Sequence, residues 1–445
     1  MPHVALVPFT GFRIREEEML ALGMTLPGLK QRASAVAQLP ALGLLTLAGL
    51  IPPHWTCSYH EAAHVDDQLI DEVMRERPTL VALSALTASV EEAYRFSALL
   101  RQGGTRVVLG GLHATACPDE TRQHCDAVVV GEGEPVWPEL LSDAESDELQ
   151  PVYRASTPYH LRDSPIPRFD LLGDRPRPRF TVQTQRGCPL ACEFCGASRL
   201  LGPFRTKPVE NLKRELAAIT AQVHKPVLEL ADDNTFAGGR DTGELLETLA
   251  SADTRYFTEV DWRVGENTDL LSGLAASGCV QVLVGIESLV FRYPGMGPKQ
   301  AELPRIMNAI DAIQAAGVAV IACFIVGCDG ETQFSLDRLA KFIELSQVAD
   351  VQLTLQTPFP GTALRRRLER EGRLLPDRGW SHCTLFDLTY RPDAMDVVEL
   401  ELAFRDLVLR VFAPPESARR QAIRKRVWQN NPRLRPCESE PFSST

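Results

Sequence analysis

Short runs of apolar residues alternate with predicted helices along this chain, and this alternation limits the fold more than any other feature. The runs form two groups, one in the first 150 residues and one after residue 180. Runs that are apolar throughout are typical of strands buried on both faces, which occur in parallel sheets covered by helices. Each group is therefore expected to form an α/β unit with its functional groups at the carboxyl ends of the strands.

The first group predicts a doubly wound, Rossmann-like domain over residues 1–150. Ser89 starts a capping-box pattern, which predicts a helix reaching about Arg101. Residues 151–179 contain six prolines and are expected to form a linker laid over the surface, because proline lacks a backbone donor. The strands are predicted at residues 4–8, 80–86, 106–111 and 127–131.

The second group predicts a partial (β/α)6 barrel of the TIM type over residues 180–372, open on one side. Helices such as residues 209–223 and 303–316 would coat it. The last residues, 373–445, predict a helical segment that closes the open side over a substrate, with the basic residues of its final helix in solvent. Six strands are predicted, at residues 180–184, 227–231, 256–260, 281–285, 318–325 and 351–355.

Three cysteines follow the first barrel strand at C-x3-C-x2-C spacing, namely Cys188, Cys192 and Cys195. Thiolates this close in sequence can bind three irons of a [4Fe–4S] cluster. No fourth cysteine follows nearby, so the fourth iron would stay open to a second molecule. The alternative is a zinc knuckle, which the ligand count disfavours because zinc sites usually take four ligands. The motif therefore predicts chemistry rather than electron storage.

Three loops rich in glycine and hydroxyl side chains follow strands of the first domain. Glycines let the backbone approach a large ligand closely, and Ser or Thr hydroxyls can bond its polar tail. Tight turns without a ligand explain such loops equally well when the loops are taken alone, because short glycine motifs are weak evidence. The loops are Ser84-Ala-Leu-Thr87, Gly110-Gly-Leu-His-Ala-Thr115 and Gly131-Glu-Gly-Glu134.

The cysteine motif, with Phe194 before its last cysteine, resembles that of the radical S-adenosylmethionine (SAM) enzymes. The loops of the first domain resemble those of the cobalamin-binding domain fused to one large class of these enzymes, which includes the class B methyltransferases. The resemblance implies that SAM chelates the open iron, and that an electron from the cluster splits SAM into methionine and a 5′-deoxyadenosyl radical. It also implies cobalamin contacts from Ser84, Leu86, Thr87, Gly110, Gly111, His113, Thr115, Gly131, Glu132, Gly133 and Glu134.

The ends of the barrel strands carry polar residues or glycines, and the same resemblance assigns three groups of them to SAM. The first group would contact the methionine amine, since a carboxylate beside a fixed ammonium forms a charge-assisted pair. The second would bind other polar groups of SAM, and the third would flank the adenine. The alternative is that these polar ends only cap the following helices. The first group is Asp232, Asp233 and Asn234, the second is Glu287 and Ser288, and the third is Gly327.

Many cobalamin proteins have an Asp-x-His-x-x-Gly loop after the first strand, whose histidine ligates cobalt from below. No stretch between Pro8 and Ala48 matches this pattern, and His113 lies in a different loop. We therefore expect no histidine beneath cobalt, as the resemblance to this class also implies. A first domain that binds no cobalamin is the alternative.

The residues and the resemblance together imply a cobalamin-dependent radical SAM enzyme that methylates an unactivated carbon of a small molecule. The methyl group would pass from SAM to cobalamin and then to a substrate radical. The alternatives are radical cyclisation, rearrangement or transfer of another SAM-derived group, with or without cobalamin, and a non-enzymatic cobalamin sensor, which the intact cysteine triplet disfavours. The resemblance also implies an electron donor such as flavodoxin or ferredoxin.

Composition and charge limit the kinds of partner that the protein can bind and the cell compartment in which it is expected. The net charge is −11 and no long basic run is present, which argues against nucleic acid as the main partner. The 11 cysteines form no disulfide-like framework, and the first residues lack the basic start of a signal peptide, so a reducing cytoplasm is expected. The longest apolar run, about residues 42–52, is too short to span a bilayer.

Overall fold

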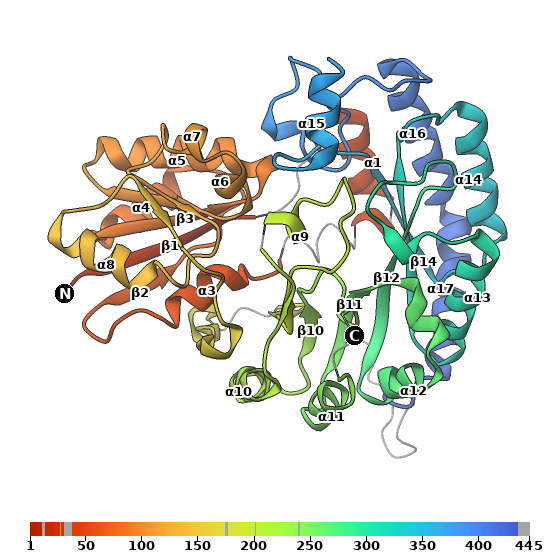
Figure 1. Cartoon of the computed structure of the whole chain (residues 1–445), viewed down its shortest axis with the longest axis horizontal. Coiled ribbons are helices and arrows are strands. Elements are labelled where there is room, and N and C mark those ends of the chain that lie inside the picture. Colours follow the sequence, from red (N-terminus) through yellow and green to blue (C-terminus); the bar gives the residue numbers. More distant parts are fainter. Residues whose placement is uncertain are drawn as a thin grey trace.

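The computed structural model describes residues 1–10, 14–26, 28–30, 38–173, 177–200, 202–238 and 241–434. These residues form two α/β units that lie side by side, each built on a six-stranded parallel sheet (Figure 1). A two-stranded antiparallel ribbon, β8 (Gln185–Arg186) with β9 (Arg205–Thr206), brackets the cysteine motif. No helix in this described part of the chain is both long and apolar enough to cross a membrane.

The first sheet has the strand order β2-β1-β3-β4-β5-β6, with every neighbouring pair parallel. Helices cover both faces: α3 (Leu42–Ala48) and α8 (Trp137–Ser146) one face, α4 (Asp67–Arg75) and α5 (Val90–Gln102) the other. This arrangement confirms the predicted doubly wound domain. The strands are β1 (His3–Phe9), β2 (Thr56–Tyr59), β3 (Leu80–Ala85), β4 (Arg106–Gly110), β5 (Ala127–Val130) and β6 (Val152–Arg154).

The two edge strands and the start of α5 differ from the prediction. β2 and β6 are both absent from the predicted set, and β6 lies inside the predicted linker. Both are short and partly exposed, so their apolar signal in the sequence is weak. The capping-box prediction is wrong, because the Ser89 side chain does not cap α5 and a 3-10 turn, Thr87–Ser89, leads into the helix.

The second sheet has the order β14-β13-β12-β11-β10-β7 and confirms the six predicted barrel strands. β7 and β14 are the two edges and do not pair with each other, so the barrel is open. The strands are β7 (Phe180–Val182), β10 (Val227–Leu230), β11 (Arg255–Val260), β12 (Cys279–Glu287), β13 (Ala319–Val326) and β14 (Asp350–Leu355). The helices that follow them are α10 (Val209–Thr220), α11 (Gly243–Ser251), α12 (Thr268–Ala276), α13 (Leu303–Ala315) and α14 (Gln333–Leu345).

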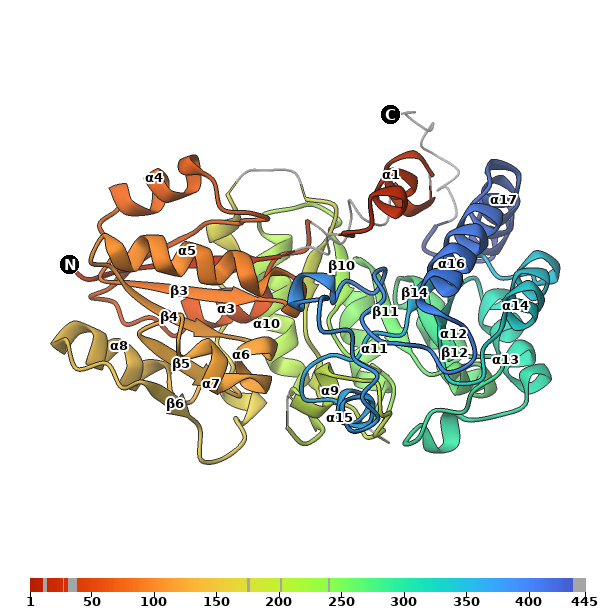
Figure 2. The ribbon, with the colours of Figure 1, turned by 90° about the horizontal axis from the view of Figure 1, so that it is seen from above.

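The last two helices pack on the outside of the barrel rather than over its open side. α16 (Val397–Val411) packs on α14, and α17 (Pro414–Gln429) packs on β13 and β14 (Figures 1 and 2). The predicted solvated basic face of α17 is wrong in part. Arg420 is 2% exposed and donates to a carbonyl of α16 at 2.6 Å. Arg419 donates to two carbonyls at the end of α14.

Two other segments lie at the carboxyl ends of the barrel strands. The loop 373–395 follows α15 (Ala363–Arg370) and hydrogen-bonds to the last residue of β14. α1 (Glu17–Thr25) falls in the predicted first domain but packs with the barrel, because Met19 belongs to the barrel core. Two backbone amides at the start of α1 donate to Asp387 of the same loop. The chain therefore crosses to the barrel between β1 and α3.

Candidate active site between the two domains

The loop that carries the three cysteines is held in shape by the segment after β12. The Ala191 amide donates to the Gly295 carbonyl at 3.0 Å. The Glu193 amide donates to the Pro294 carbonyl at the same distance. Gly295 has φ +82°, and a Cβ there would lie 1.9 Å from the Ala191 carbonyl oxygen. Because only glycine permits this approach, the two segments form one unit.

The three predicted cluster cysteines lie together in a mostly apolar setting. Cys192 is 8% exposed and packs with Tyr293 and Met296, while Cys188 and Cys195 are half-buried. Burial is the main cause that raises the pKa of Cys192 to about 11, with smaller contributions in the same direction from Glu287 and the other two thiols. Three sulfur donors inside an apolar shell fit an iron–sulfur cluster, whose binding displaces the thiol protons.

A buried ion pair, which sequence analysis missed, lies beside the cysteine loop. Glu287, at the end of β12, pairs with Lys299, and their side chains are 7% and 12% exposed. Burial lowers the pKa of Lys299, but Glu287 outweighs burial and raises it overall. A Cβ at Gly285 would lie 2.5 Å from the Lys299 Nζ, so glycine makes room for the pair. Lys299 also lowers the pKa of Cys192, which places its charge near the cysteines.

The loop after β10 carries three predicted SAM contacts, of which two are hydrogen-bonded to other parts of the barrel and one is not. Asp232 accepts hydrogen bonds from the Thr184 amide at 2.8 Å and the Thr184 hydroxyl at 2.5 Å. Asn234 accepts one from the Asp261 amide at 3.1 Å. These two residues therefore tie neighbouring strand ends together. Asp233 has no hydrogen bond or ion pair with any described residue, and burial, followed by Asp232, raises its pKa to about 6.

Ser288 and Gly327 are engaged by the surrounding loops. The Ser288 hydroxyl accepts hydrogen bonds from the Val290 and Phe291 amides, both at 3.0 Å, and so shapes the turn after β12. Gly327 has φ +91°, and its carbonyl accepts a hydrogen bond from the Tyr390 hydroxyl. A Cβ at Gly327 would lie 2.6 Å from that hydroxyl. The loop 373–395 therefore covers this strand end.

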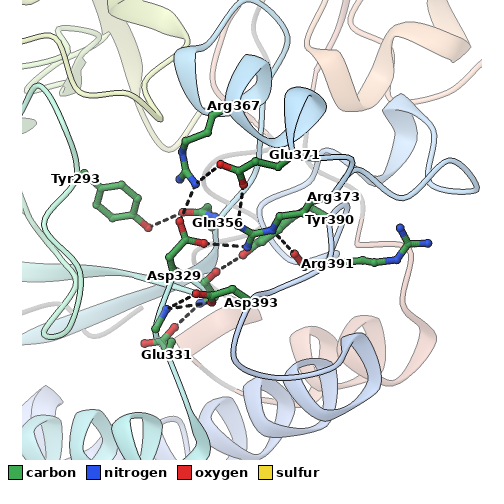
Figure 3. A network of polar contacts seen from close by, with 12 residues as sticks. Tyr293, Asp329, Glu331, Gln356, Arg367, Glu371, Arg373, Tyr390, Arg391 and Asp393 are labelled. Carbon is green, nitrogen blue, oxygen red and sulfur yellow. Dashed lines mark hydrogen bonds and ion pairs between the residues drawn. The ribbon is translucent and has the colours of Figure 1, made fainter.

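A network of ion pairs joins the cysteine loop to the loops after β13 and α15. Arg367 contacts Glu193 at 3.2 Å and Asp329 at 2.7 Å. Asp329 also accepts from Arg373 at 2.8 Å, and Figure 3 shows the two arginines converging on this carboxylate. Because Glu193 directly follows Cys192, the network fixes the cysteine loop against the rest of the barrel.

Glu259 is a further acidic residue that sequence analysis missed. It follows Thr258 on β11, and Thr258 bonds to Thr235 on the other face of the strand, so Glu259 points into the barrel. Its side chain is accessible to solvent, but protein surrounds it closely enough to disfavour its charged form. Burial, followed by repulsion from Asp233, raises its pKa to about 8. The interior beside Asp233 is therefore rich in carboxyl groups.

A cavity of about 260 Å³ lies at the carboxyl ends of β3, β4 and β5. Gly111 has φ +101° and a Cβ there would lie 3.0 Å from the Ser84 hydroxyl oxygen, so glycine is needed beside this strand end. The barrel contributes Gln183, Arg186 and Ala231, so the cavity reaches the interface between the domains. The first domain contributes apolar Leu44, Leu47, Val108, Val129 and Trp137, and the predicted Ser84, Gly110, Gly111, Gly131, Glu132, Gly133 and Glu134.

The two glutamates of the Gly131–Glu134 loop bind arginines of the barrel. Arg186 contacts Glu132 at 2.5 Å and Glu134 at 2.8 Å, and all three side chains are at most 12% exposed. Arg205 makes a second ion pair with Glu132 at 2.9 Å. These contacts clamp the cavity rim to the ribbon that brackets the cysteines. Sequence analysis could not find the clamp because its partners are 52 or more residues apart.

Four predicted cobalamin residues do not line the cavity: Leu86, Thr87, Thr115 and His113. Thr115, in α6 (Leu112–Ala116), accepts a hydrogen bond from the Gly131 amide at 2.9 Å and so shapes the rim. His113 is fully buried, 3.5 Å from Glu120 of α7 (Pro118–Thr121) and 5.1 Å from the Trp380 ring. Burial lowers its pKa. His113 therefore belongs to the contact between the first domain and the loop 373–395.

Comparison with known proteins bears on both halves of this site. Residues 31–141 match the family model of the B12 binding domain, and residues 182–343 match that of the radical SAM superfamily. An uncharacterised methyltransferase of Synechocystis is 30% identical over 76% of this chain, and the chain spans 64% of that protein. The bacteriochlorophyllide d C-12(1)-methyltransferase of Chlorobaculum tepidum is 25% identical, covering 68% of this chain and 69% of its own length. The cobalamin-dependent SAM radical enzyme OxsB, solved with aqua-cobalamin, has a TM-score of 0.68 at 16% identity, over 91% of this chain and 66% of its own.

Proposed function

Since the chain belongs to the radical SAM enzymes that carry a B12-binding domain, we propose that it methylates an unactivated carbon of a small-molecule substrate. One observation supports this most strongly: Arg186 lines the cavity of the first domain and stands two residues before Cys188. The clamp from Arg186 to Glu132 and Glu134 therefore brings the two candidate cofactor sites to one interface.

The barrel residues would hold the cluster and SAM. When bound, the cluster and SAM supply a radical that activates the substrate carbon, and cobalamin carries the methyl group. Cys188, Cys192 and Cys195 would ligate the cluster. Asp233 would hold the SAM ammonium, because it is the carboxylate of its loop that has no other described partner and the pair would be charge-assisted. Lys299, kept charged by Glu287, would attract the SAM carboxylate.

The first domain would hold cobalamin through shape rather than charge. The apolar wall of the cavity suits a flat heterocycle such as the nucleotide tail of cobalamin. The glycines on its rim would let backbone groups touch the corrin closely. The described residues that line the cavity include no histidine, so we propose that cobalt receives no imidazole from this cavity.

Anaerobic reconstitution with iron, sulfide and cobalamin, followed by incubation with SAM and a chemical reductant, tests the proposal. Mass spectrometry should detect both 5′-deoxyadenosine and S-adenosylhomocysteine, the products expected when SAM serves as radical source and as methyl donor. Changing Cys188, Cys192 and Cys195 together to Ala should abolish 5′-deoxyadenosine, whereas Cys125→Ala, a buried cysteine of the first domain, should not. If 5′-deoxyadenosine formed without S-adenosylhomocysteine, and formed equally well without cobalamin, that result would contradict methylation and favour another radical reaction.

A further inference from the structure

α15 is a basic helix in an acidic chain. Residues 363–373 contain five arginines and two glutamates, a local balance of +3, whereas the whole chain carries −11. Figures 1 and 2 show α15 at the edge of the molecule in two perpendicular views, so one side of the helix faces solvent. A positive surface of this kind attracts acidic partners, although the net negative charge of the chain repels them.

The arginines of α15 divide into paired and unpaired residues. Arg367 belongs to the network with Glu193 and Asp329. Arg365 pairs with Glu369 at 3.1 Å. Arg366 and Arg370 are exposed, and each donates only to a backbone carbonyl of its own segment, with no ion pair to a described residue. Being four residues apart, these two lie next to each other on one face of the helix.

The first turn of α15 packs directly on the cysteine loop. The Leu364 amide donates to the Glu193 carbonyl at 3.0 Å, and Glu193 directly follows Cys192. A Cβ at Gly196, next to Cys195, would lie 3.6 Å from the Thr362 side chain that caps the helix. A Cβ at Gly361, just before the helix, would lie 3.0 Å from the Leu200 side chain at the end of α9 (Ala197–Leu200). The unpaired arginines therefore stand on the helix that covers the cysteines.

We propose that the exposed face of α15, centred on Arg366 and Arg370, docks an acidic one-electron carrier protein that reduces the cluster. The inference rests on the proposed cluster at the three cysteines but not on methylation. The carrier loses one electron and the cluster gains it, with no bond made or broken. A positive surface beside the cluster would steer an acidic carrier to a place where the path for electron transfer is short.

A double charge reversal, Arg366→Glu with Arg370→Glu, tests the docking surface in the cluster-loaded protein. Reduced flavodoxin serves as the probe, and stopped-flow absorbance at about 400 nm follows cluster reduction. We expect the second-order rate at low salt to fall about tenfold or more, and to lose the salt dependence of the parent protein. The affinity for labelled flavodoxin, read by fluorescence anisotropy, should fall in parallel.

The matched control is Arg214→Glu with Lys425→Glu, which makes the same charge change at exposed residues of α10 and α17. Its rate should stay within about twofold of the parent protein, because steering is local. Reduction by dithionite, a small molecule, should be unchanged in both variants. An equal loss in the control, or an equal loss with dithionite, would overturn the docking surface. No arm of the experiment uses SAM or a substrate, so a failed methylation assay would leave its result intact.

Discussion

The carboxyl-terminal edges of the two sheets form the two halves of the site by different physical means. The edge of the first sheet borders a cavity with an apolar wall and a glycine rim. The edge of the barrel is crowded with buried and half-buried charges, including the Glu287–Lys299 pair, the Arg367–Asp329 contact and Asp233, which has no partner among the described residues. The first edge can hold a ligand by shape, whereas the paired charges of the second depend on keeping their partners.

This difference has an energetic consequence. Removing one member of a buried pair leaves an uncompensated charge, whereas adding a side chain to a preformed cavity mainly takes space from a ligand. Substitutions at the barrel edge should therefore reduce the stability of the protein itself. Substitutions at the apolar wall or the glycines of the first edge should reduce ligand binding and leave the stability nearly unchanged.

The largest effect is expected for Lys299→Met. The change leaves the buried Glu287 carboxylate without its partner and should lower the free energy of unfolding by about 4 kcal/mol. Urea unfolding measures the loss. The double variant Lys299→Met with Glu287→Gln should regain most of the stability, because no unpaired charge remains. Equal losses in the single and double variants would show that charge is not what the pair contributes.

A smaller loss is expected for Arg186→Met. Glu134 loses its partner, but Glu132 keeps Arg205, so the free energy of unfolding should fall by about 2 kcal/mol. The first domain should also become separable from the barrel, with a second transition in calorimetry. Arg205→Met is the control, because Arg186 still pairs with both glutamates and the domains should unfold together.

A third, pH-dependent effect concerns His113. Burial lowers its pKa in the folded protein, with Arg365 acting in the same direction and Glu120 and Glu91 opposing. The folded state therefore binds this proton less readily than the unfolded state, and stability should fall as pH drops below about 6.5. His113→Gln should remove part of that acid-induced loss and change little at pH 8. An unaltered pH profile would contradict this assignment.

The smallest effect on stability is expected for Gly133→Val. A Cβ at this position would lie 3.3 Å from the Leu47 side chain, which lines the cavity. The new side chain should reduce cobalamin retention tenfold or more, yet change the free energy of unfolding of the cobalamin-free protein by only about 0.5 kcal/mol. Cobalamin content after gel filtration and a urea titration measure the two quantities. A large loss of stability would contradict the contrast between the edges.

The architecture could be predicted from the sequence because its signals are local. Strands such as β1, β3, β5 and β13 are mainly apolar runs, and a run of this kind indicates a strand buried on both faces. The edge strands β2 and β6 were not predicted, because they are short and partly exposed. The position of α1 against the barrel was not predicted either, since a short helix with a single buried residue does not indicate which sheet it will cover.

The site was predictable only where residues act through their spacing. The three cysteines are recognisable from the sequence alone, and the structure brings them together. The Glu287–Lys299 pair and the Arg186 clamp depend on residues from separate loops or domains, so no local pattern marks them. The sequence marks the loop Asp232–Asn234 as a polar strand end, but only the structure separates Asp232 and Asn234, which bond to neighbouring strand ends, from Asp233, which has no partner among the described residues.

Paramagnetic resonance of the cobalamin-loaded protein in its cob(II)alamin form tests most directly how the first domain holds its ligand. The cobalt lines should show no nitrogen splitting, because the tail of cobalamin would occupy the apolar cavity and the described residues of the cavity offer no imidazole. A threefold splitting of each line would mean that an imidazole or the cobalamin base lies beneath cobalt, and would contradict this mode of binding. Protein that retained no cobalamin after reconstitution would contradict it as well.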